Sequence, residues 1–286
     1  MASYEKYTMP VGKSDEARLL ALNAICNPES LRFIDDVSLN LEGKTVADIG
    51  CGTGIMSVHW AKKVGKRGKV IAIDISEEQL AVAKAYAEKQ GVLNIQYICL
   101  PVERLSEIGE CVDLVYTRFL LEHLANPELA IKQMLGLIKP NGYLFCETVT
   151  SYEAIFSDPE TEMTRQWREA VLLQPTFHQT DFYLGKRLFS LYPSFGLSRK
   201  FFRLAQPLMT ENKASVDFSV GYMLAMKNKL ASTSIFSEES VLEIAEAIEQ
   251  YLLEGGVIAF PQYVQVLGQK EEKNAKSVSF SEIKRR

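Results

Sequence analysis

Three glycines alternate at positions 50, 52 and 54 of the segment DIGCGTG, which covers residues 48–54. Glycine takes a positive φ at little cost, so such a loop can bring main-chain N–H groups against a ligand that side chains would keep away. The following segment, Ile55–Lys63, is helix-like, and the N–H groups at a helix N-terminus favour negative or electron-rich atoms. The spacing therefore predicts a loop that binds a ligand through its backbone.

The glycine spacing and one acidic residue narrow the choice of ligand. Dinucleotide-binding loops use G-x-G-x-x-G, in which the third glycine lets the helix pack closely after the pyrophosphate turn. Here the third glycine comes one residue earlier, and Asp48 opens the motif. A carboxylate at that place repels a pyrophosphate but suits a ligand with an ammonium or sulfonium group.

The elements that must position this loop follow from the hydrophobic pattern of residues 45–149. Short apolar runs alternate with helix-like segments, which predicts a parallel sheet with helices on both faces. Ser76 is expected to cap a helix that runs to about Gln90, and Pro127–Ile138 is expected to form another helix. The expected strands are Thr45–Ile49, Lys69–Asp74, Ile95–Cys99, Leu114–Thr117 and Gly142–Thr148.

After residue 149 this alternation ends. Residues 150–190 are rich in aromatic residues at helical spacing, whereas Ser198–Pro207 and Gln262–Gly268 have strand patterns. Residues 212–255, between those two strands, have a helical pattern. We expect a late antiparallel hairpin and helical insertions over the carboxyl edge of the sheet, where open α/β folds bind ligands.

The glycine motif and three later segments resemble the S-adenosylmethionine-dependent methyltransferases of the Rossmann-like type (class I), and among these the small-molecule enzymes. The first motif of that family has the form acidic-x-G-x-G-x-G. Asp74, at the end of VIAID, matches the second acidic residue of the family, which accepts hydrogen bonds from both ribose hydroxyls. The segments DLVYTRFLLEHL and KPNGYLFCET match its fourth segment and its fifth strand. The resemblance covers residues 40–150 well and the remainder loosely.

The resemblance implies S-adenosylmethionine as cofactor and a set of residues around it. Ile75 stands where the family places an apolar residue against the adenine, and Val102 and Glu103 are further neighbours on the adenine side. Pro101 replaces an Asp that commonly contacts the adenine amino group. Thr117 and Arg118 fall beside the methionine moiety. The predicted cofactor-binding residues are Asp48, Gly50, Cys51, Gly52, Gly54, Asp74, Ile75, Val102, Glu103, Thr117 and Arg118.

The same resemblance predicts an α/β fold with a Rossmann-like sheet of seven mostly parallel strands, a late antiparallel hairpin and helical insertions that form a lid. We expect an N-terminal helical segment over the cofactor site at 1–40 and a cofactor-binding core at 41–150. A helical substrate lid is expected at 151–196. The last two strands are expected within 197–269, with inserted helices at 212–255, and a flexible tail at 270–286.

The predicted reaction needs little acid–base chemistry, because a sulfonium already makes its methyl group electrophilic. The protein must mainly hold an acceptor in line with the S–C bond in a water-poor pocket. Orientation can suffice for a phenol or a carboxylate, whereas an alcohol or an acidic carbon needs a general base. His123, His178 and Asp181 are candidates for that base, and the sequence assigns none of them as the catalytic residue.

Structural roles are the alternatives for several of these residues. Asp74 could instead be an acid favoured at a helix N-terminus, and His123 could be a packed, hydrogen-bonded histidine. Some of the aromatic residues belong either to a helical core or to an apolar substrate pocket. These are Tyr152, Phe156, Trp167, Phe177, Phe182 and Tyr183.

Composition limits the partners of the chain. Its 32 Lys and Arg against 36 Asp and Glu give a net charge of −4, which argues against nucleic acid and anionic membranes. Five scattered cysteines without a CxxC pair predict no metal site and fit a reducing compartment. The N-terminus MASYEKYTMP lacks an apolar signal core, and no apolar run is long enough to span a membrane. We therefore expect a cytoplasmic protein, with a homodimer among its possible assemblies.

The expected function is methyl transfer to the oxygen or carbon of a small apolar or aromatic metabolite. The chain lacks the Asn- or Asp-Pro-Pro-Tyr/Phe signature of amino-methylating relatives, and its later segments are aromatic. Three alternatives stay open: a protein methyltransferase, a catalytically inactive S-adenosylmethionine-binding protein, and a nicotinamide-dependent oxidoreductase.

Overall fold

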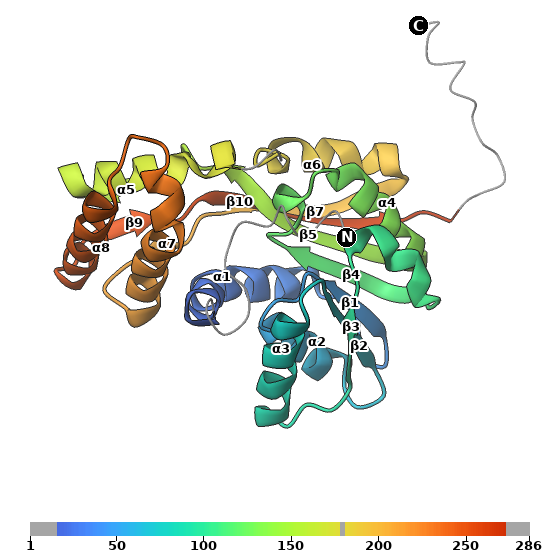
Figure 1. Cartoon of the computed structure of the whole chain (residues 1–286). Helices are drawn as coiled ribbons and strands as arrows, with labels where there is room; N and C mark the ends of the chain where they lie inside the picture. Colours follow the sequence, from blue (N-terminus) through green and yellow to red (C-terminus); the bar gives the residue numbers. More distant parts are fainter. Residues whose placement is uncertain (1–15, 178–180, 273–286) are drawn as a thin grey trace, which may run out of the picture.

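A sheet of seven strands forms the centre of the computed structural model, which describes residues 16–177 and 181–272 (Figure 1). Five strands run parallel in the order β3-β2-β1-β4-β5. The last strand, β10, lies antiparallel between β5 and β7. The predicted fold class is confirmed. The strands are β1 (Thr45–Ile49), β2 (Lys69–Asp74), β3 (Ile95–Cys99), β4 (Val112–Arg118), β5 (Ile138–Ser151), β7 (Leu197–Ala205) and β10 (Gln262–Lys270).

Helices cover both faces of this sheet. On one face α1 (Glu16–Val37) and α2 (Ile55–Val64) bury Phe33 and Trp60 against the sheet, with α3 (Glu77–Lys89) beside α2. Phe33 stacks on Phe145 of β5, with ring centroids 4.6 Å apart. The opposite face is covered by α4 (Pro127–Leu137), α6 (Gly185–Leu191) and the 3₁₀ helix η3 (Val102–Ile108).

A second group of helices gathers beyond one end of the sheet (Figure 1). It consists of α5 (Glu162–Leu172), α7 (Lys213–Ala231) and α8 (Glu238–Leu253), around a core that includes Trp167, Met226 and Ile248. Ile25 of α1 belongs to the same core, so α1 packs on both the sheet and this helical group. A small sheet in the order β6-β9-β8 completes the group. Its strands are β6 (Ser157–Asp158), β9 (Val257–Ala259) and β8 (Leu208–Met209).

Most elements agree closely with the sequence pattern. The first three expected strands coincide with β1, β2 and β3, and β4 and β5 extend beyond the expected ranges. Ser76 caps α3 by accepting a hydrogen bond from the Gln79 main-chain N–H at 3.3 Å. Both α7 and α8 lie within the expected helical stretch 212–255. The small sheet was not expected, because strands of two or three residues are too short to show alternation.

Parts of some predictions lie outside the described residues. These parts are residues 1–15 of the N-terminal segment, residues 178–180 with His178, and residues 273–286 of the predicted tail. Lys270, where that tail was expected to begin, is the last residue of β10. In the described part of the chain, no helix combines the length and the apolar character needed to cross a membrane.

Candidate functional site

A cavity of about 350 Å³ opens at the carboxyl ends of the parallel strands. Its wall at one end is formed by the glycine loop after β1 and by Asp74 at the end of β2. Its other end is lined by aromatic residues from α5 and α7 and from the segments that flank the last strands. This edge of an open parallel sheet is where ligands bind in α/β folds.

The glycine loop is fixed by main-chain hydrogen bonds to the neighbouring strand. The N–H groups of Gly50 and Cys51 donate to the carbonyl of Ile73 at 2.8 and 3.0 Å. Gly52 and Gly54 have φ values of +52° and +73°. A Cβ on Gly52 would meet no atom within 4 Å, so this glycine leaves its surroundings open to a ligand.

Gly54 has a packing role in the same loop. A Cβ at this position would lie 2.6 Å from the Cβ of Ala83 on α3, closer than real Cβ contacts allow. The missing side chain therefore lets the start of α2 approach α3. Gly54 does not line the cavity.

Asp74 lies at the cavity wall between the glycine loop and α3. Its carboxylate accepts hydrogen bonds from the main-chain N–H groups of Gly52 and Ser76, both at 3.0 Å. Burial raises the pKa of Asp74, and these hydrogen bonds oppose the rise. The contact with Ser76 is the helix-start contact that the sequence offered as an alternative, and the cavity position is compatible with the predicted contact with ribose.

Asp48 also faces the cavity and is almost fully buried. It accepts a hydrogen bond from the Ser57 hydroxyl at 2.5 Å. Burial raises the pKa of Asp48 to about 6, while the Ser57 hydrogen bond and the Arg118 charge oppose the rise. At neutral pH Asp48 is mainly ionised and places a negative charge beside the glycine loop.

Arg118 ties α1 to the carboxyl end of β4. Its guanidinium donates to Asn23 Oδ1 at 2.7 Å, to Asn27 Oδ1 at 2.8 Å and to the Ser30 hydroxyl at 3.0 Å. Asn23 in turn donates to the Thr53 hydroxyl of the glycine loop at 3.4 Å. This network places α1 along the cavity, and the sequence did not reveal it because the partners are about 90 residues apart.

Some of the remaining predicted cofactor-binding residues line the cavity and one does not. Cys51, Ile75, Val102 and Glu103 line the cavity with the residues described above. Thr117 does not line the cavity, and its side chain is buried in β4. The structure thus brings together all the predicted cofactor-binding residues except Gly54 and Thr117.

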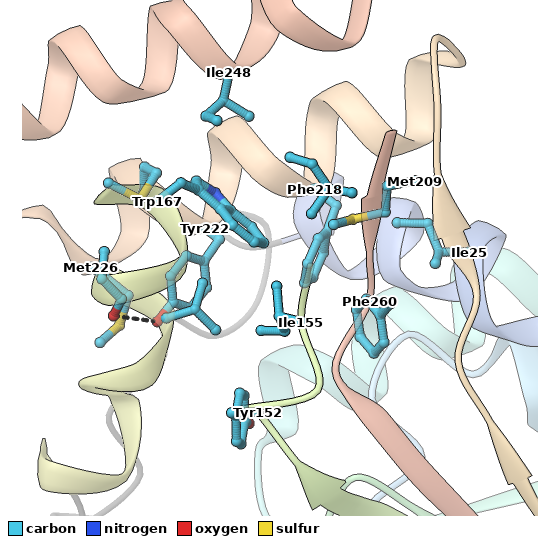
Figure 2. Close-up of a cluster of buried hydrophobic side chains, with 14 of the residues drawn as sticks. Ile25, Tyr152, Ile155, Trp167, Met209, Phe218, Tyr222, Met226, Ile248 and Phe260 are labelled. Carbon is cyan, nitrogen blue, oxygen red and sulfur yellow. Dashed lines mark hydrogen bonds between the residues drawn. The ribbon is translucent and has the colours of Figure 1, made fainter. Parts of the chain in front are cut away.

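The other end of the cavity is aromatic. Trp167 of α5 and Tyr222 of α7 lie side by side, with ring centroids 6.5 Å apart, and Phe218 and Phe260 adjoin them at 5.4 Å from each other (Figure 2). The Trp167 indole N–H donates to the Ser219 carbonyl, and the Tyr222 hydroxyl to the Ala170 carbonyl, both at 3.4 Å. The polar atoms of both rings are therefore directed to the backbone, which leaves apolar surface for the cavity.

The aromatic residues singled out in the sequence thus have different locations. Tyr152 and Trp167 line the cavity, which supports the pocket interpretation for these two. The others are absent from the cavity wall, and Phe156 is half exposed while Phe182 is buried in the core of the helical group.

Of the three candidate bases, only one is among the described residues of the cavity wall. His123 lines the cavity, and its ring meets Phe182 edge-on at 5.3 Å between centroids. Asp181 is not part of the wall and pairs with Arg187. His178 lies outside the described residues.

Glu122 also lines the cavity, although the sequence pattern did not predict it as a site residue. Only 1% of its surface is exposed, and its Oε2 accepts a hydrogen bond from the Thr148 hydroxyl at 2.9 Å. Its Oε1 is buried without a hydrogen-bond partner among the described residues. Burial raises the pKa of Glu122 to about 7. The only sign of Glu122 in the sequence is a carboxyl group beside His123 in LLEHL. The apolar neighbours in that segment favour a packing role for His123 and do not draw attention to Glu122.

A glycine loop after β1, an acid at the end of β2 and this order of seven strands define the Rossmann-like class of S-adenosylmethionine-dependent methyltransferases. Residues 40–190, more than half of the chain, match the methyltransferase domain family. The chain belongs to this family. Among the described residues no cluster of three or more His, Cys, Asp or Glu is arranged to hold a metal ion.

Named relatives and solved structures agree with this assignment. The chain is 37% identical over 141 residues to a ubiquinone biosynthesis O-methyltransferase from Coxiella burnetii, across 49% of this chain and 55% of that protein. The chain thus spans about half the length of the curated relatives it matches. Coclaurine N-methyltransferase, bound to N-methylheliamine and S-adenosylhomocysteine, shares the fold at a TM-score of 0.52 and 19% identity, over 84% of this chain and 71% of that chain.

A further structural neighbour shows that the fold does not decide the reaction. The 4+2 cyclase SpnF has a TM-score of 0.55 and 15% identity, over 92% of this chain and 98% of that chain. Proteins of one fold can therefore carry different chemistries, and the reaction has to be argued from the residues of the site.

Proposed function

We propose that this protein transfers a methyl group from S-adenosylmethionine to the oxygen of a small apolar or aromatic metabolite. The observation that carries the proposal is a single cavity with a glycine-loop end and an aromatic end. A donor and an acceptor must share one space for direct transfer, and this cavity offers each a wall of suitable chemistry.

The residues at the glycine-loop end fit the donor. Gly52 leaves open space where a side chain would intrude, and Asp74 offers carboxylate oxygens at the cavity wall. Asp48 supplies negative charge beside them, which suits a cationic nucleoside better than a pyrophosphate. When bound there, S-adenosylmethionine supplies an electrophilic methyl group.

The aromatic end favours an apolar acceptor. Trp167, Phe218 and Phe260 offer flat apolar surface, which holds an aromatic ring and excludes water. The relatives named ubiquinone biosynthesis O-methyltransferase support transfer to oxygen rather than to carbon. The same name supports a quinone-like or polyketide-like acceptor.

Calorimetry with S-adenosylmethionine and with NAD tests the donor. We expect binding of S-adenosylmethionine and none of NAD, because Asp48 and the early third glycine disfavour a pyrophosphate. Binding of NAD alone would overturn the proposal in favour of an oxidoreductase.

Transfer of a labelled methyl group to a panel of hydroquinones, catechols and phenols then tests the acceptor. We expect methyl ethers as the products. Tight donor binding with no transfer to any member would favour the inactive S-adenosylmethionine-binding alternative. Label in a protein, captured from an extract and absent from the small molecules, would favour the protein methyltransferase.

A further inference from the structure

Resting on the proposed function, we propose that Glu122 takes the proton of the acceptor, and that the acceptor is a hydroxyl compound which binds uncharged. Glu122 lines the cavity, and its buried carboxylate oxygen Oε1 has no hydrogen-bond partner among the described residues. Buried polar atoms are nearly always hydrogen-bonded in folded proteins, so an unpaired one at a cavity wall indicates a place for a ligand atom.

The position of Glu122 fits the meeting point of the two substrates. It belongs to the 3₁₀ turn η4 (Leu121–His123), which directly follows β4. In the sheet β4 lies between β1, which leads into the glycine loop, and β5, which leads towards Tyr152. Glu122 therefore follows the middle one of these three strands, and it lines the cavity that both ends share.

The two carboxylate oxygens of Glu122 have different surroundings. Oε2 accepts a hydrogen bond from Thr148 of β5, which fixes the orientation of the group, whereas Oε1 has no hydrogen-bond partner among the described residues. The described residues give Glu122 no ion pair within 4.0 Å. Burial raises its pKa to about 7, and this rise is opposed by the main-chain N–H groups of Glu122 and Val149 and by the Thr148 hydroxyl. Glu122 therefore accepts a proton more readily than an exposed glutamate, yet it is substantially ionised at neutral pH.

The proton transfer completes the bond changes of the proposed reaction. The acceptor O–H bond breaks, its proton forms a bond with Oε1 of Glu122, and its electron pair becomes available for the new O–C bond. The S–C bond of the donor breaks with its electron pair retained by sulfur. The products are a methyl ether, S-adenosylhomocysteine and protonated Glu122, and no other reactant is required.

The same carboxylate restricts the acceptor. A carboxylate or phenolate entering the cavity would be repelled by ionised Glu122, because two like charges in a water-poor site interact strongly. A neutral hydroxyl instead donates a hydrogen bond to Oε1. We therefore infer an acceptor with a weakly acidic hydroxyl, such as a phenol or catechol.

The test compares the Glu122→Gln variant with a Glu128→Gln variant. Glu128 is an exposed glutamate on α4, so its variant serves as the matched control. Both variants and the wild type are assayed with phenols of similar size and graded acidity. General base catalysis contributes about 10²–10⁴-fold. We expect E122Q to lose about 100-fold in kcat with the least acidic phenols and little with the most acidic, whose neutral hydroxyl releases its proton in the transition state without a base. E128Q should match the wild type throughout.

Two further measurements separate a proton acceptor from a structural role. Infrared titration should show a carboxyl group that titrates near neutrality in the wild type and is lost in E122Q. Calorimetry should show unchanged donor affinity in E122Q. Glu122→Asp, which keeps a carboxylate, should restore the shallow dependence on phenol acidity even if its rates are lower.

The outcomes distinguish the inference from the proposed function. Equal losses in E122Q across all phenols, or full activity with the least acidic ones, would overturn the role of Glu122 while the methyltransferase proposal stands. Donor binding by the wild type with no transfer to any phenol would overturn the proposed function and this inference with it. A preference for carboxylic acids would overturn the inferred acceptor class.

Discussion

Asp74 is the residue for which the sequence made its most specific ligand prediction. Its carboxylate already accepts two main-chain hydrogen bonds, which fix its direction at the cavity wall. We predict that Asp74→Ala weakens S-adenosylmethionine binding by about 1–3 kcal/mol, because charge-assisted hydrogen bonds to the ligand are lost. Calorimetry measures this, with the exposed Glu78→Ala on α3 as control. An unchanged dissociation constant in Asp74→Ala would refute the ribose contact.

The titration of Glu122 has a consequence for stability. Burial raises its pKa from 4.5 to about 7, so the folded state binds this proton more tightly than the unfolded state does. Stability from this group is therefore complete below about pH 4.5 and falls as pH rises to about 7, by about 3 kcal/mol.

Urea denaturation at pH 5, about two units below the folded-state pKa of Glu122, and at pH 7, close to it, measures this effect. We predict that Glu122→Gln, which cannot ionise, loses less stability across this range than the wild type. Asp48, whose pKa burial raises to about 6, contributes a similar trend in both proteins and cancels in the comparison. Parallel curves for the two proteins would contradict the raised pKa of Glu122.

At the scale of single residues the sequence was informative where a motif was local. Residues 48–54 and Asp74 could be identified because their spacing along the chain reflects one loop and one strand end. Glu122 could not, because its significance depends on burial and on an unpaired oxygen, which arise only when Thr148 and the helical group pack around it.

Among the elements, the contact between α2 and α3 depends on Gly54. We predict that Gly54→Ala destabilises the fold by about 2–5 kcal/mol. Overpacking of its Cβ against Ala83 contributes about 1–3 kcal/mol, and the left-handed backbone at φ +73° contributes about 1–2 kcal/mol. Replacing Ala83 by Gly in the same chain should restore part of that loss. Thermal denaturation of the single and double variants measures the coupling.

Gly91 is the matched control for this experiment. It also has a positive φ, +66°, but a Cβ there would meet no atom within 4 Å. Gly91→Ala should therefore cost only the backbone strain, about 1–2 kcal/mol, and Ala83→Gly should not relieve it. Equal rescue at both positions would show that the α2–α3 contact is not the cause.

Helix and strand elements could be predicted well where each has its own pattern. The strands β1 to β3 and the cap of α3 follow from short apolar runs and from Ser76. An N-terminal helix over the cofactor site was expected from the resemblance, but the contacts that hold α1 there could not be foreseen, since they join Arg118 to Asn23 and Ser30 far along the chain.

In the whole molecule, the two ends of the cavity have different origins. The glycine-loop end comes mainly from residues 48–124, whereas the aromatic end combines α1, α5, α7 and Phe260. The sequence could predict the first end because it is nearly contiguous. The second needed the packing of distant segments, so the acceptor could be inferred only as a class.

This division predicts that the two ends can be altered independently. Trp167→Ala should raise the KM for a phenolic acceptor about tenfold or more through loss of aromatic contact, with little change in donor affinity. Steady-state kinetics and donor calorimetry measure the two effects. Trp60→Phe on α2, a buried residue outside the cavity wall, controls for a general loss of packing. A matching loss of donor affinity in Trp167→Ala would show that the ends are coupled.

The position of β10 affects how the chain can fold during synthesis. This strand inserts between β5 and β7, although it follows β5 by more than 100 residues. Until residues 262–270 leave the ribosome, both β5 and β7 have edges without their final neighbour. Such edges can pair with other chains, and pairing over this sequence distance slows folding. The aromatic end of the cavity, which includes Phe260, is therefore completed only after Phe260 and β10 have been synthesised.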